Sequence, residues 1–195
     1  LLIFALKLDE EEHQLLSGRN VRYLYIDYPR EKDHCIYTNN VLGGELAGRY
    51  LRDKGVKSPC YIGVDPPAQS NIDRYNGFSQ VYGEVPTYSC GLSEEAGYAT
   101  ALKVMASGQY DGVFCYCDDI ASGFVQAVRE KNSPMRVIGF DGVRATKYLN
   151  LSTISQEPRL IGTKAASRIV EIMRAKEEPE PIIECIKPIL IDRGS

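Results

Sequence analysis

The sequence of residues 112–143, GVFCYCDDIASGFVQAVREKNSPMRVIGFDGV, decides the fold class. Gly112–Cys117 is a short apolar run that predicts a buried strand, and Arg136–Phe140 predicts the next strand. Between these runs the apolar residues recur with the period of a helix; they are Ile120, Ala121, Phe124, Val125 and Val128. Two strands joined by a helix of this length predict a βαβ unit with parallel strands and a right-handed crossover.

The same alternation continues on both sides of this unit. Further strands are predicted at Leu1–Leu6, Arg22–Tyr28, Cys35–Tyr37, Cys60–Val64, Tyr88–Cys90 and in Ile182–Ile191, which is interrupted at Pro188. Helices are predicted at Asp9–Leu16, Gly43–Lys54, Asn71–Tyr82, Ser93–Ala106 and Pro158–Lys176. Helices on both faces of parallel sheets make a doubly wound α/β fold.

Two features define the helix ends and faces more closely. Ser93 is predicted to cap the helix that follows it, and either Asp118 or Asp119 is predicted to cap the helix after Cys117. On the longest helix the predicted buried stripe consists of Ile161, Ala165, Ile169 and Met173.

The charge balance gives no sign of a nucleic-acid-binding surface. The 195 residues include 23 Lys+Arg and 26 Asp+Glu, a formal net charge of −3, and no basic block stands out. No apolar run approaches the roughly 20 residues that span a bilayer, so no membrane contact is expected. Leu1–Leu6 lacks the basic flank and cleavage site of a signal peptide, and a cytoplasmic location is expected.

The six cysteines, at positions 35, 60, 90, 115, 117 and 185, are interpreted as reduced, small core residues of a cytosolic chain. No C-x-x-C pair is present, and His13 and His34 lie far in sequence from the closely spaced pair Cys115 and Cys117. Neither a metal site nor a bound cofactor is therefore predicted.

Catalytic motifs are also missing. The sequence contains no P-loop, no dinucleotide-binding G-x-G-x-x-G and no G-x-S-x-G elbow, and two scattered histidines argue against a Ser–His–acid triad. Asp118–Asp119 could hold a cation, but helix capping is the favoured interpretation of that pair. No catalytic residue is predicted.

The topology instead points to binding residues. In doubly wound sheets, ligands bind outside the carboxyl ends of the strands. The polar residues directly after predicted strands are Asp27, Asp65, Cys117–Asp119 and Asp141. These positions are the first candidates for a site.

Several segments together resemble the lactose-repressor (LacI/GalR) family of bacterial transcriptional regulators. Within that family, the resemblance is greatest to the purine and ribose repressors. The segments are YTNNVLGGELAGRYL (37–51), DRYNGF (73–78), GVFCYCDDIASG (112–123), VIGFDGV (137–143), LSTISQ (151–156) and PILIDRGS (188–195). They occur in the family's order and at about its spacing, over nearly the whole chain.

The resemblance implies a two-lobed periplasmic-binding-protein-like fold. The N-terminal lobe is expected at residues 1–38 plus 157–184 and is expected to be incomplete, because the βα units that should open it would precede Leu1. The C-terminal lobe is expected at residues 39–156 plus 185–195. A small effector, a sugar or related polar metabolite, is expected in the cleft between the lobes. In the family, closure of the cleft controls operator DNA binding by N-terminal headpieces of a homodimer, and such a headpiece is not among these residues.

The resemblance assigns the central effector contacts to Arg74 and Asp141. Arg74 matches the family's arginine that hydrogen-bonds an effector, and its rigid fork of donors suits vicinal hydroxyls. Without the resemblance, a solvated helix arginine is the expected alternative. Asp141 matches the effector-binding aspartate, and its alternative is an Asp-Gly turn.

Four further positions match effector or pocket residues. Ser70 matches a position that often contributes a polar side chain, with a helix N-cap as the equally weighted alternative. Asp118 matches the family's aspartate after the strand, where capping is the alternative. Asp27 matches an aspartate of the opposing lobe, and Gln156 lies at a lobe crossing, in the hinge or at the pocket edge.

Two positions depart from the family pattern. Cys117 stands where many sugar-responsive members carry asparagine, and a thiol is a poor hydrogen-bond partner. Leu92 stands near an aromatic ring that stacks on the effector in some members, and the flat apolar platform is lost. The effector is therefore expected to be atypical, or the pocket to use one of the 13 tyrosines.

Two other classes stay open at this point. A sugar-binding protein of a transport system would have the same fold, although the cysteine content argues mildly against export. An enzyme is the third hypothesis, and the missing catalytic motifs do not support it. The leading hypothesis is the effector-sensing and dimerisation domain of a LacI-type repressor.

Overall fold

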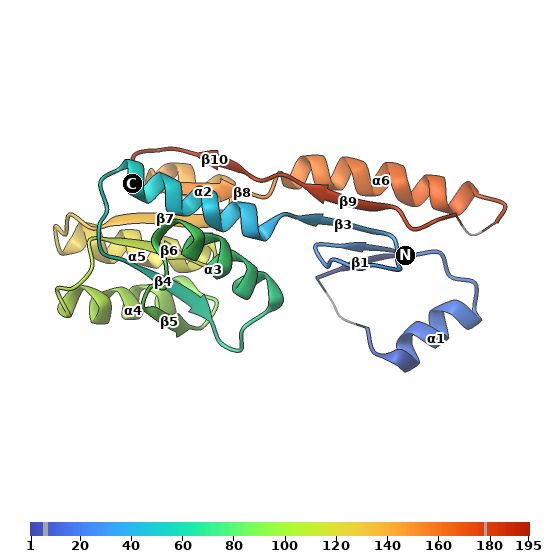
Figure 1. Cartoon of the computed structure of the whole chain (residues 1–195), viewed down its shortest axis with the longest axis horizontal. Helices are drawn as coiled ribbons and strands as arrows, with labels where there is room; N and C mark the ends of the chain where they lie inside the picture. Colours follow the sequence, from blue (N-terminus) through green and yellow to red (C-terminus); the bar gives the residue numbers. More distant parts are fainter. Residues whose placement is uncertain (6–7, 178) are drawn as a thin grey trace. The chain divides into compact units, whose positions relative to one another are not determined.

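The computed structural model of the chain describes residues 1–5, 8–177 and 179–195. The chain forms two compact units. Unit 1 consists of residues 1–39 and 157–187, and unit 2 of residues 40–156 and 188–195. Both units are α/β, with the elements labelled in Figure 1.

Unit 2 is built on a mostly parallel sheet. Its strands are β4 (Pro59–Val64), β5 (Thr87–Cys90), β6 (Gly112–Cys115), β7 (Arg136–Asp141), β8 (Ser152–Ser155) and β10 (Ile189–Ile191). Their order across the sheet is β10-β8-β7-β6-β4-β5, and β10 pairs antiparallel with β8 while the other pairs are parallel. The sequence pattern did not predict β8 as a strand.

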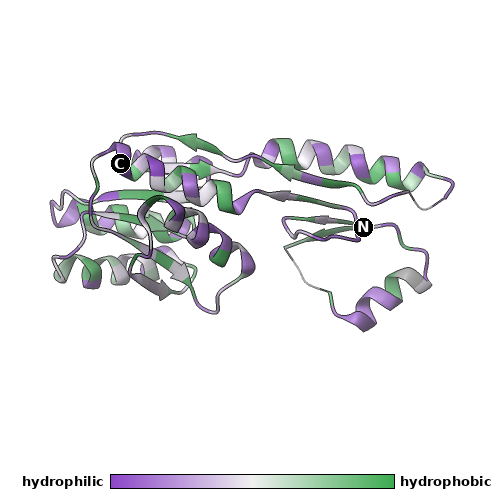
Figure 2. Cartoon of the chain, viewed as in Figure 1, coloured by the Kyte–Doolittle hydropathy of each residue, from purple (hydrophilic) through white to green (hydrophobic). Residues whose placement is uncertain are grey.

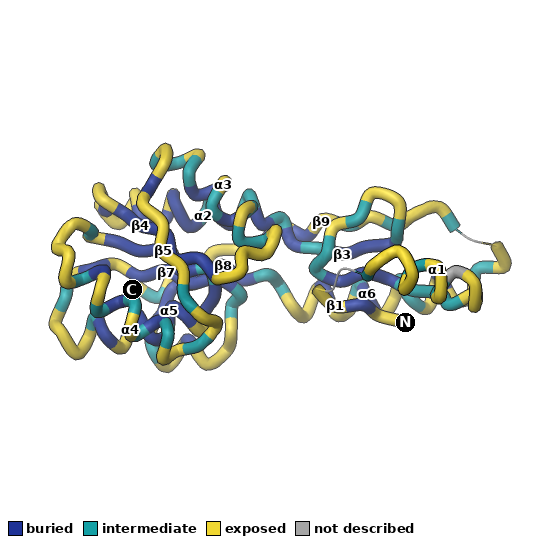
Figure 3. The backbone as a smooth tube through the Cα atoms, turned by 90° about the horizontal axis from the view of Figure 1, so that it is seen from below, coloured by how far each residue is buried: buried dark blue, intermediate teal, exposed yellow. Residues whose placement is uncertain are grey.

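Two helix pairs cover this sheet (Figure 1). Side chains at alternate positions along a strand point to opposite faces. Accordingly, Tyr61, Phe114 and Phe140 pack with α2 (Asn40–Asp53) and α3 (Gln69–Tyr82). Cys60, Val113 and Cys115 pack with α4 (Glu94–Ala106) and α5 (Asp118–Glu130). The central strands of the sheet are buried on both faces, as the dark colour of β4 and β7 shows (Figure 3), whereas the edge strands β5 and β10 are mostly exposed.

Glycines let the helices within each pair come into backbone contact. A Cβ at Gly44 of α2 would lie 1.9 Å from the Arg74 carbonyl oxygen, and one at Gly77 of α3 would lie 1.9 Å from the Val41 oxygen. In the second pair, a Cβ at Gly123 of α5 would lie 2.0 Å from the Glu94 oxygen. These contacts explain why α2 starts at Asn40 and not at Gly43 as predicted: its glycines are packing positions inside the helix, not its beginning.

The predicted helix caps have mixed outcomes. Ser93 caps α4, because its Oγ accepts a 3.1 Å hydrogen bond from the Ala96 amide, and this prediction is confirmed. The cap predicted at Asp118 or Asp119 is wrong, since Cys117 is the N-cap residue of α5 and Asp118 is already helical. The capping alternative for Ser70 is also wrong, because Ala68 precedes the first turn of α3.

Unit 1 contains a parallel sheet in the order β1-β2-β3-β9. The strands are β1 (Leu2–Phe4), β2 (Leu24–Ile26), β3 (Cys35–Thr38) and β9 (Ile183–Ile186), with helices α1 (Glu10–Gly18) and α6 (Pro158–Arg174). Leu6, the predicted end of the first strand, lies outside the described residues. Hydrophilic and hydrophobic residues alternate along helix α6, as expected for a helix with one buried face (Figure 2).

The buried stripe of α6 differs from the prediction at its end. Ile161 and Ala165 are buried and Ile169 packs against them, but Met173 is 65% exposed and Ile172 is fully buried. Three successive steps of four residues drift by about 120° around a helix of 3.6 residues per turn, whereas eleven residues return within about 20° of the start. The stripe therefore closes at Ile172.

The cysteines are all free thiols. Those at positions 35, 60, 115 and 117 are buried, as predicted for core residues, and Cys90 is half-buried. The interpretation is wrong for Cys185, which is exposed on β9. Burial raises the pKa of the Cys60 thiol to about 12 and that of Cys117 to about 11, so both are neutral at physiological pH.

Candidate functional site

The carboxyl ends of the parallel strands in unit 2 bring polar side chains together. Arg74 reaches this edge from α3, Asp141 ends β7, and Gln156 follows β8. We use the name Arg74 network for Arg74 and the residues that contact its guanidinium or Asp141, which are Asn40, Tyr116, Phe140, Asp141 and Gln156.

Arg74 is a buried arginine with fixed partners. Its side chain is 3% exposed, its Nε donates to Asn40 Oδ1 at 2.9 Å, and its Nη1 donates to the Tyr116 carbonyl at 2.6 Å. Nη1 also lies 3.6 Å from Asp141 Oδ1. The alternative of a solvated helix arginine is therefore wrong. Nη2 makes no hydrogen bond to any residue that the structure describes.

Two aromatic rings flank the guanidinium. The Cζ atom of Arg74 lies 3.6 Å from the ring centre of Phe140 and 4.5 Å from that of Tyr116. Cation–π contacts of this kind are stronger where water is excluded. The rings therefore hold the cation in one plane in addition to its hydrogen bonds.

Asp141 occupies a special backbone position. Its φ is 112°, outside the conformations that L-residues favour, and Gly142 continues with a φ of 75°. The Gly142 amide donates to Thr153 Oγ1 at 3.2 Å, and the Gln156 amide nitrogen Nε2 donates to Asp141 Oδ1 at 2.6 Å. The structure assigns no turn at these residues, so the Asp-Gly turn expected as an alternative is wrong; the Asp141 carboxylate at the end of β7 lies within reach of Arg74 and Gln156.

Asp118 packs against the segment that follows β7. It is 1% exposed, and its Oδ2 accepts a 2.7 Å hydrogen bond from the Val143 amide. Its Oδ1 packs against Gly139, where a Cβ would lie only 2.3 Å away, and it has no hydrogen-bond partner among the described atoms. Burial, with a smaller contribution from the Asp141 charge, raises the pKa of Asp118 from 3.8 to about 7.

Ser70 and Cys117 both lie next to Tyr116 of the network, Ser70 through a side-chain contact and Cys117 as its neighbour in sequence. The Ser70 hydroxyl is 2.9 Å from the Tyr116 hydroxyl, which places Ser70 beside the residue that accepts from Arg74. Cys117 directly follows Tyr116 and is 6% exposed. The structure therefore brings both predicted residues to the same edge of the sheet as Arg74.

Leu92 lies apart from the network in unit 2, and Asp27 belongs to the other unit. Leu92 is 60% exposed and follows β5, which lies three strand positions from β7, or about 14 Å at the usual spacing of strands. Asp27 belongs to unit 1, where it follows β2 with a φ of 56° and its amide donates to the Ile36 carbonyl at 2.8 Å. Their predicted effector contacts stay predictions.

Three network residues were missed from the sequence: Asn40, Tyr116 and Phe140. The strand-end rule selected only polar side chains, and it passed over two aromatic residues at the ends of β6 and β7. Asn40 lies in the quoted segment 37–51, but it was not expected to start α2. Its position at the first turn, facing Arg74, depends on the close packing of α2 against α3.

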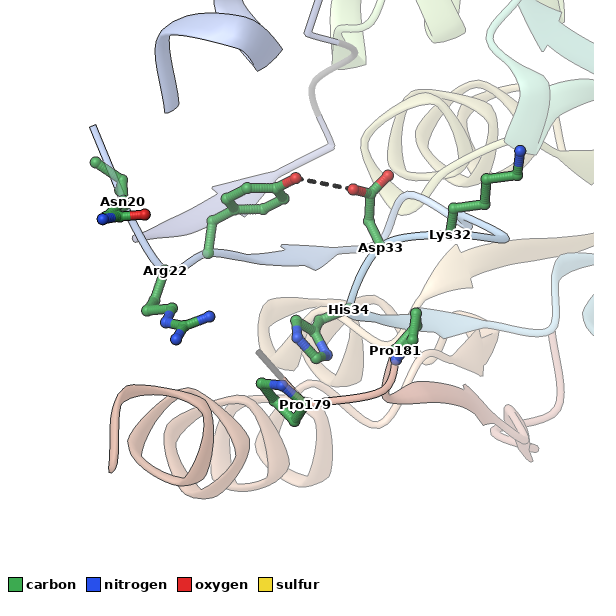
Figure 4. A pocket seen from close by; sticks show the side chains of 9 residues that line it. Asn20, Arg22, Lys32, Asp33, His34, Pro179 and Pro181 are labelled. Carbon is green, nitrogen blue, oxygen red and sulfur yellow. Dashed lines mark hydrogen bonds between the residues drawn. The ribbon is translucent and has the colours of Figure 1, made fainter. Parts of the chain in front are cut away.

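Unit 1 contains a separate cavity of about 370 Å³ (Figure 4). Tyr23, Asp33 and His34 line it, with the Tyr23 hydroxyl donating to Asp33 Oδ1 at 2.8 Å and the Ile182 amide donating to His34 Nδ1 at 2.9 Å. Burial lowers the pKa of His34. These residues precede β2, β3 and β9, so the cavity lies at the amino ends of these strands, whereas Asp27 follows the carboxyl end of β2.

Neither a metal cluster nor a membrane-spanning helix is found in the part of the chain that the structure describes. There, no group of three or more His, Cys, Asp or Glu residues is placed to hold a metal ion. Within the same residues, no helix combines the length and apolar character needed to cross a membrane.

Comparison with known proteins decides the family. Residues 49–195 match the model of the periplasmic binding protein-like domain. The chain belongs to this family. Within it, the predicted resemblance to the effector-binding domains of LacI/GalR regulators is confirmed by curated relatives and by a solved structure of similar fold.

The curated relatives are transcriptional regulators and not enzymes. The HTH-type transcriptional repressor PurR of Actinobacillus pleuropneumoniae serotype 3 (strain JL03) is 26% identical over 200 residues, which cover 93% of this chain and 60% of the relative. PurR of Histophilus somni (strain 2336) is 30% identical over 179 residues, covering 85% and 54%. The chain thus spans little more than half the length of the relatives it matches.

A solved structure shows the same fold. A LacI family transcriptional regulator from Enterococcus faecalis V583, with bound ribose, superimposes with a TM-score of 0.90 at 20% sequence identity, covering 98% of this chain and 74% of that chain. The predicted α/β fold of the periplasmic-binding-protein type, with doubly wound parallel sheets, is confirmed.

Proposed function

We propose that this effector-binding domain senses a sugar or a related small polar metabolite through the Arg74 network. The observation that carries the proposal is the pairing of a buried arginine with a carboxylate and an amide at the carboxyl edge of the unit 2 sheet. That edge is where doubly wound folds bind their ligands.

The chemistry of the network suits a neutral polyol. Arg74 and Asp141 balance each other's charge, so the network has no net charge that would select an ion. A sugar hydroxyl both donates and accepts, and the remaining Arg74 donors and the Asp141 carboxylate can bond vicinal hydroxyls. The ribose in the E. faecalis regulator supports this ligand class for the present chain.

The candidate residues take different roles in this proposal. Arg74 and Asp141 contact the effector, Gln156 orients Asp141, and Ser70 contributes its hydroxyl beside Tyr116. Asp118 positions the segment that follows Asp141, because it accepts a hydrogen bond from the Val143 amide. Cys117, Leu92 and the unit 1 residue Asp27 are kept as predicted contacts.

The proposed role in the whole protein is control of DNA binding. The relatives are helix-turn-helix repressors, and this chain matches about 60% of their length. We assign operator DNA contacts to a headpiece outside these 195 residues, and we expect a cytoplasmic homodimer. A sugar-binding protein of a transport system has the same fold, but repressors among the relatives favour the regulator. Effector control then requires unequal affinity for two arrangements of the protein.

A ligand panel tests the sugar site. The chain is titrated with ribose, other pentoses, hexoses, disaccharides and nucleobases while the melting temperature is followed. A ligand that binds only the folded chain stabilises it by about 2.7 kcal/mol at one hundred times its Kd. The expected result is a sugar that raises the melting temperature. The proposal fails if only nucleobases, or no compound in the panel, produce a shift that isothermal calorimetry reproduces.

A further inference from the structure

Unit 2 contains a polar hollow at the amino ends of its parallel strands. The Arg74 network lies at the opposite, carboxyl ends of these strands. The volume of the hollow is about 500 Å³. Arg129 on α5, Arg136 at the start of β7 and Arg193 after β10 line it. Arg136 begins the strand that Asp141 ends, so the strand length separates this hollow from the proposed sugar site.

Main-chain carbonyls hold the three guanidinium groups in place. Arg129 Nη2 donates to the Leu149 carbonyl, and Arg193 Nη1 donates to the Leu151 carbonyl at 2.5 Å and to Thr146 Oγ1 at 2.9 Å. Arg136 Nη1 donates to the Gly194 carbonyl at 3.1 Å. Leu149 and Leu151 are two residues apart, and Gly194 follows Arg193. The three groups therefore converge on neighbouring main-chain positions.

The charges of these arginines are not balanced locally. No Asp or Glu side chain lines the hollow, and across the described residues none of the three arginines forms an ion pair. Elsewhere in the chain arginines pair with acids, as Arg30 does with Asp33 and Arg168 with Glu184. Ser195 also lines the hollow, with its main-chain oxygen accepting from the Tyr50 hydroxyl. Three guanidinium groups in one hollow without an ion pair repel one another, and a bound anion would offset that repulsion.

The unused donors suit an oxyanion. Each guanidinium has five N–H groups, and the bonds to carbonyls and Thr146 use one terminal nitrogen of each. Planar forks of this kind bind phosphate and carboxylate groups in bidentate fashion. Val125, Met135 and Val137, all nearly fully buried, form an apolar floor that strengthens charge interactions above it.

We propose that this hollow binds a small oxyanion with at least two negative charges, such as a diphosphate or a dicarboxylate. The site is separate from the Arg74 network and does not depend on the sugar assignment. An anion there contacts α5, the start of β7 and the segment after β10 at once, and it stabilises unit 2.

Inorganic pyrophosphate is the probe for this site. Isothermal calorimetry on the 195-residue chain at low ionic strength is expected to show one bound pyrophosphate per chain, with affinity falling as salt is added. Backbone amide NMR is expected to show the largest shifts at residues 129, 136, 149–151 and 193–194. The double variant Arg129→Gln, Arg136→Gln alters two exposed side chains and is expected to weaken binding at least about tenfold.

Arg52→Gln is the matched control, because Arg52 is an exposed arginine of the same unit outside the hollow. It is expected to bind pyrophosphate like the unaltered chain. The proposal is overturned by absence of binding, by unchanged affinity of the double variant, by equal losses in the control, or by amide shifts centred on Arg74 and Asp141. Melting temperatures of all variants verify that the fold is retained.

Discussion

Gln156 donates a 2.6 Å hydrogen bond to the same carboxylate oxygen of Asp141 that lies 3.6 Å from Arg74. One oxygen is thus held from two sides, by a residue after β8 and by a residue on α3. The contact gives Gln156 a defined task, since it fixes the rotation of a carboxylate whose backbone is already constrained by a φ of 112°.

Replacing Gln156 by Leu is expected to weaken sugar binding about tenfold and also to lower the melting temperature of the chain. The variant keeps the side-chain bulk but frees the Asp141 carboxylate, and one hydrogen bond to a charged group is worth about 1.5 to 3 kcal/mol. Calorimetry with the sugar identified in the panel measures the loss. Gln126→Leu is the matched control, because among the residues that the structure describes the Gln126 side chain bonds only Glu130, on the exposed face of α5. Equal affinities for the two variants would remove Gln156 from the site.

Arg74→Ala is expected to destabilise the chain as well as abolish sugar binding. The substitution leaves Asn40 Oδ1 without its donor and Asp141 without its cation, and breaking a buried pair of this kind costs about 2 to 4 kcal/mol. Urea denaturation measures the change. Arg74→Lys separates the two effects, because it keeps the charge but loses the fork: stability is expected to recover in part, and sugar affinity is not. Full recovery of affinity would contradict the role given to the guanidinium.

The glycines between α2 and α3 give a prediction about packing. Gly44→Ala and Gly77→Ala each place a Cβ 1.9 Å from a main-chain oxygen of the facing helix, so the helices must separate. Overpacking typically costs about 1 to 3 kcal/mol, and a cost of at least about 2 kcal/mol is expected in the urea midpoint analysis.

Gly162 is a helix glycine that, unlike Gly44 and Gly77, makes no close contact with another helix within the described residues. It lies in α6, and no described atom comes within 4 Å of the point that a Cβ would occupy there. Gly162→Ala therefore replaces a glycine, which disfavours the helix, by a residue that favours it, without a steric clash. The substitution is expected to stabilise unit 1 by about 0.5 to 1 kcal/mol. If Gly162→Ala destabilised the chain as Gly44→Ala and Gly77→Ala do, close helix packing would not explain the effect of these substitutions.

The sequence was informative where apolar runs carry the structure and weak where polar residues are buried. The strands from Cys60 and Gly112 were predicted because Val, Ile and aromatic residues dominate them. β8 (Ser152–Ser155) was missed because three of its four residues are serine or threonine, and their burial depends on hydrogen bonds such as that of Ser152 Oγ with the Tyr50 hydroxyl at 2.8 Å. That partner is 102 residues away in sequence and leaves no local pattern.

The candidate site shows the same division. The rule for strand ends selected Asp141 and Asp118, and the family resemblance added Arg74 and Gln156. Neither could indicate that Asp118 turns inward to the Val143 amide, because capping preference describes only the helix that follows and not the loop packed beside it. Asn40 escaped for a related reason, since its contact with Arg74 needs the glycine-mediated approach of α2 to α3.

The buried Asp118 makes stability depend on pH. Its pKa is raised to about 7 in the folded chain, against an ordinary value of 3.8, so between about pH 4 and pH 7 the folded state binds more protons than the unfolded state. The free energy of unfolding is therefore expected to fall as pH rises through this window. The slope contributed by one proton is at most about 1.4 kcal/mol per pH unit, and it levels off above pH 7.

Asp118→Asn is expected to remove this contribution, because a neutral amide still accepts from the Val143 amide but does not ionise. Urea denaturation of the variant at intervals from about pH 4.5 to pH 8 is expected to show a flatter profile and higher stability at pH 8. Asp119→Asn serves as the control, since Asp119 is the exposed neighbour on the same turn and should keep the slope of the unaltered chain. The two carboxylates are neighbours in sequence but differ in burial. If Asp119→Asn flattened the pH profile and Asp118→Asn did not, Asp118 would not be the residue that takes up the proton.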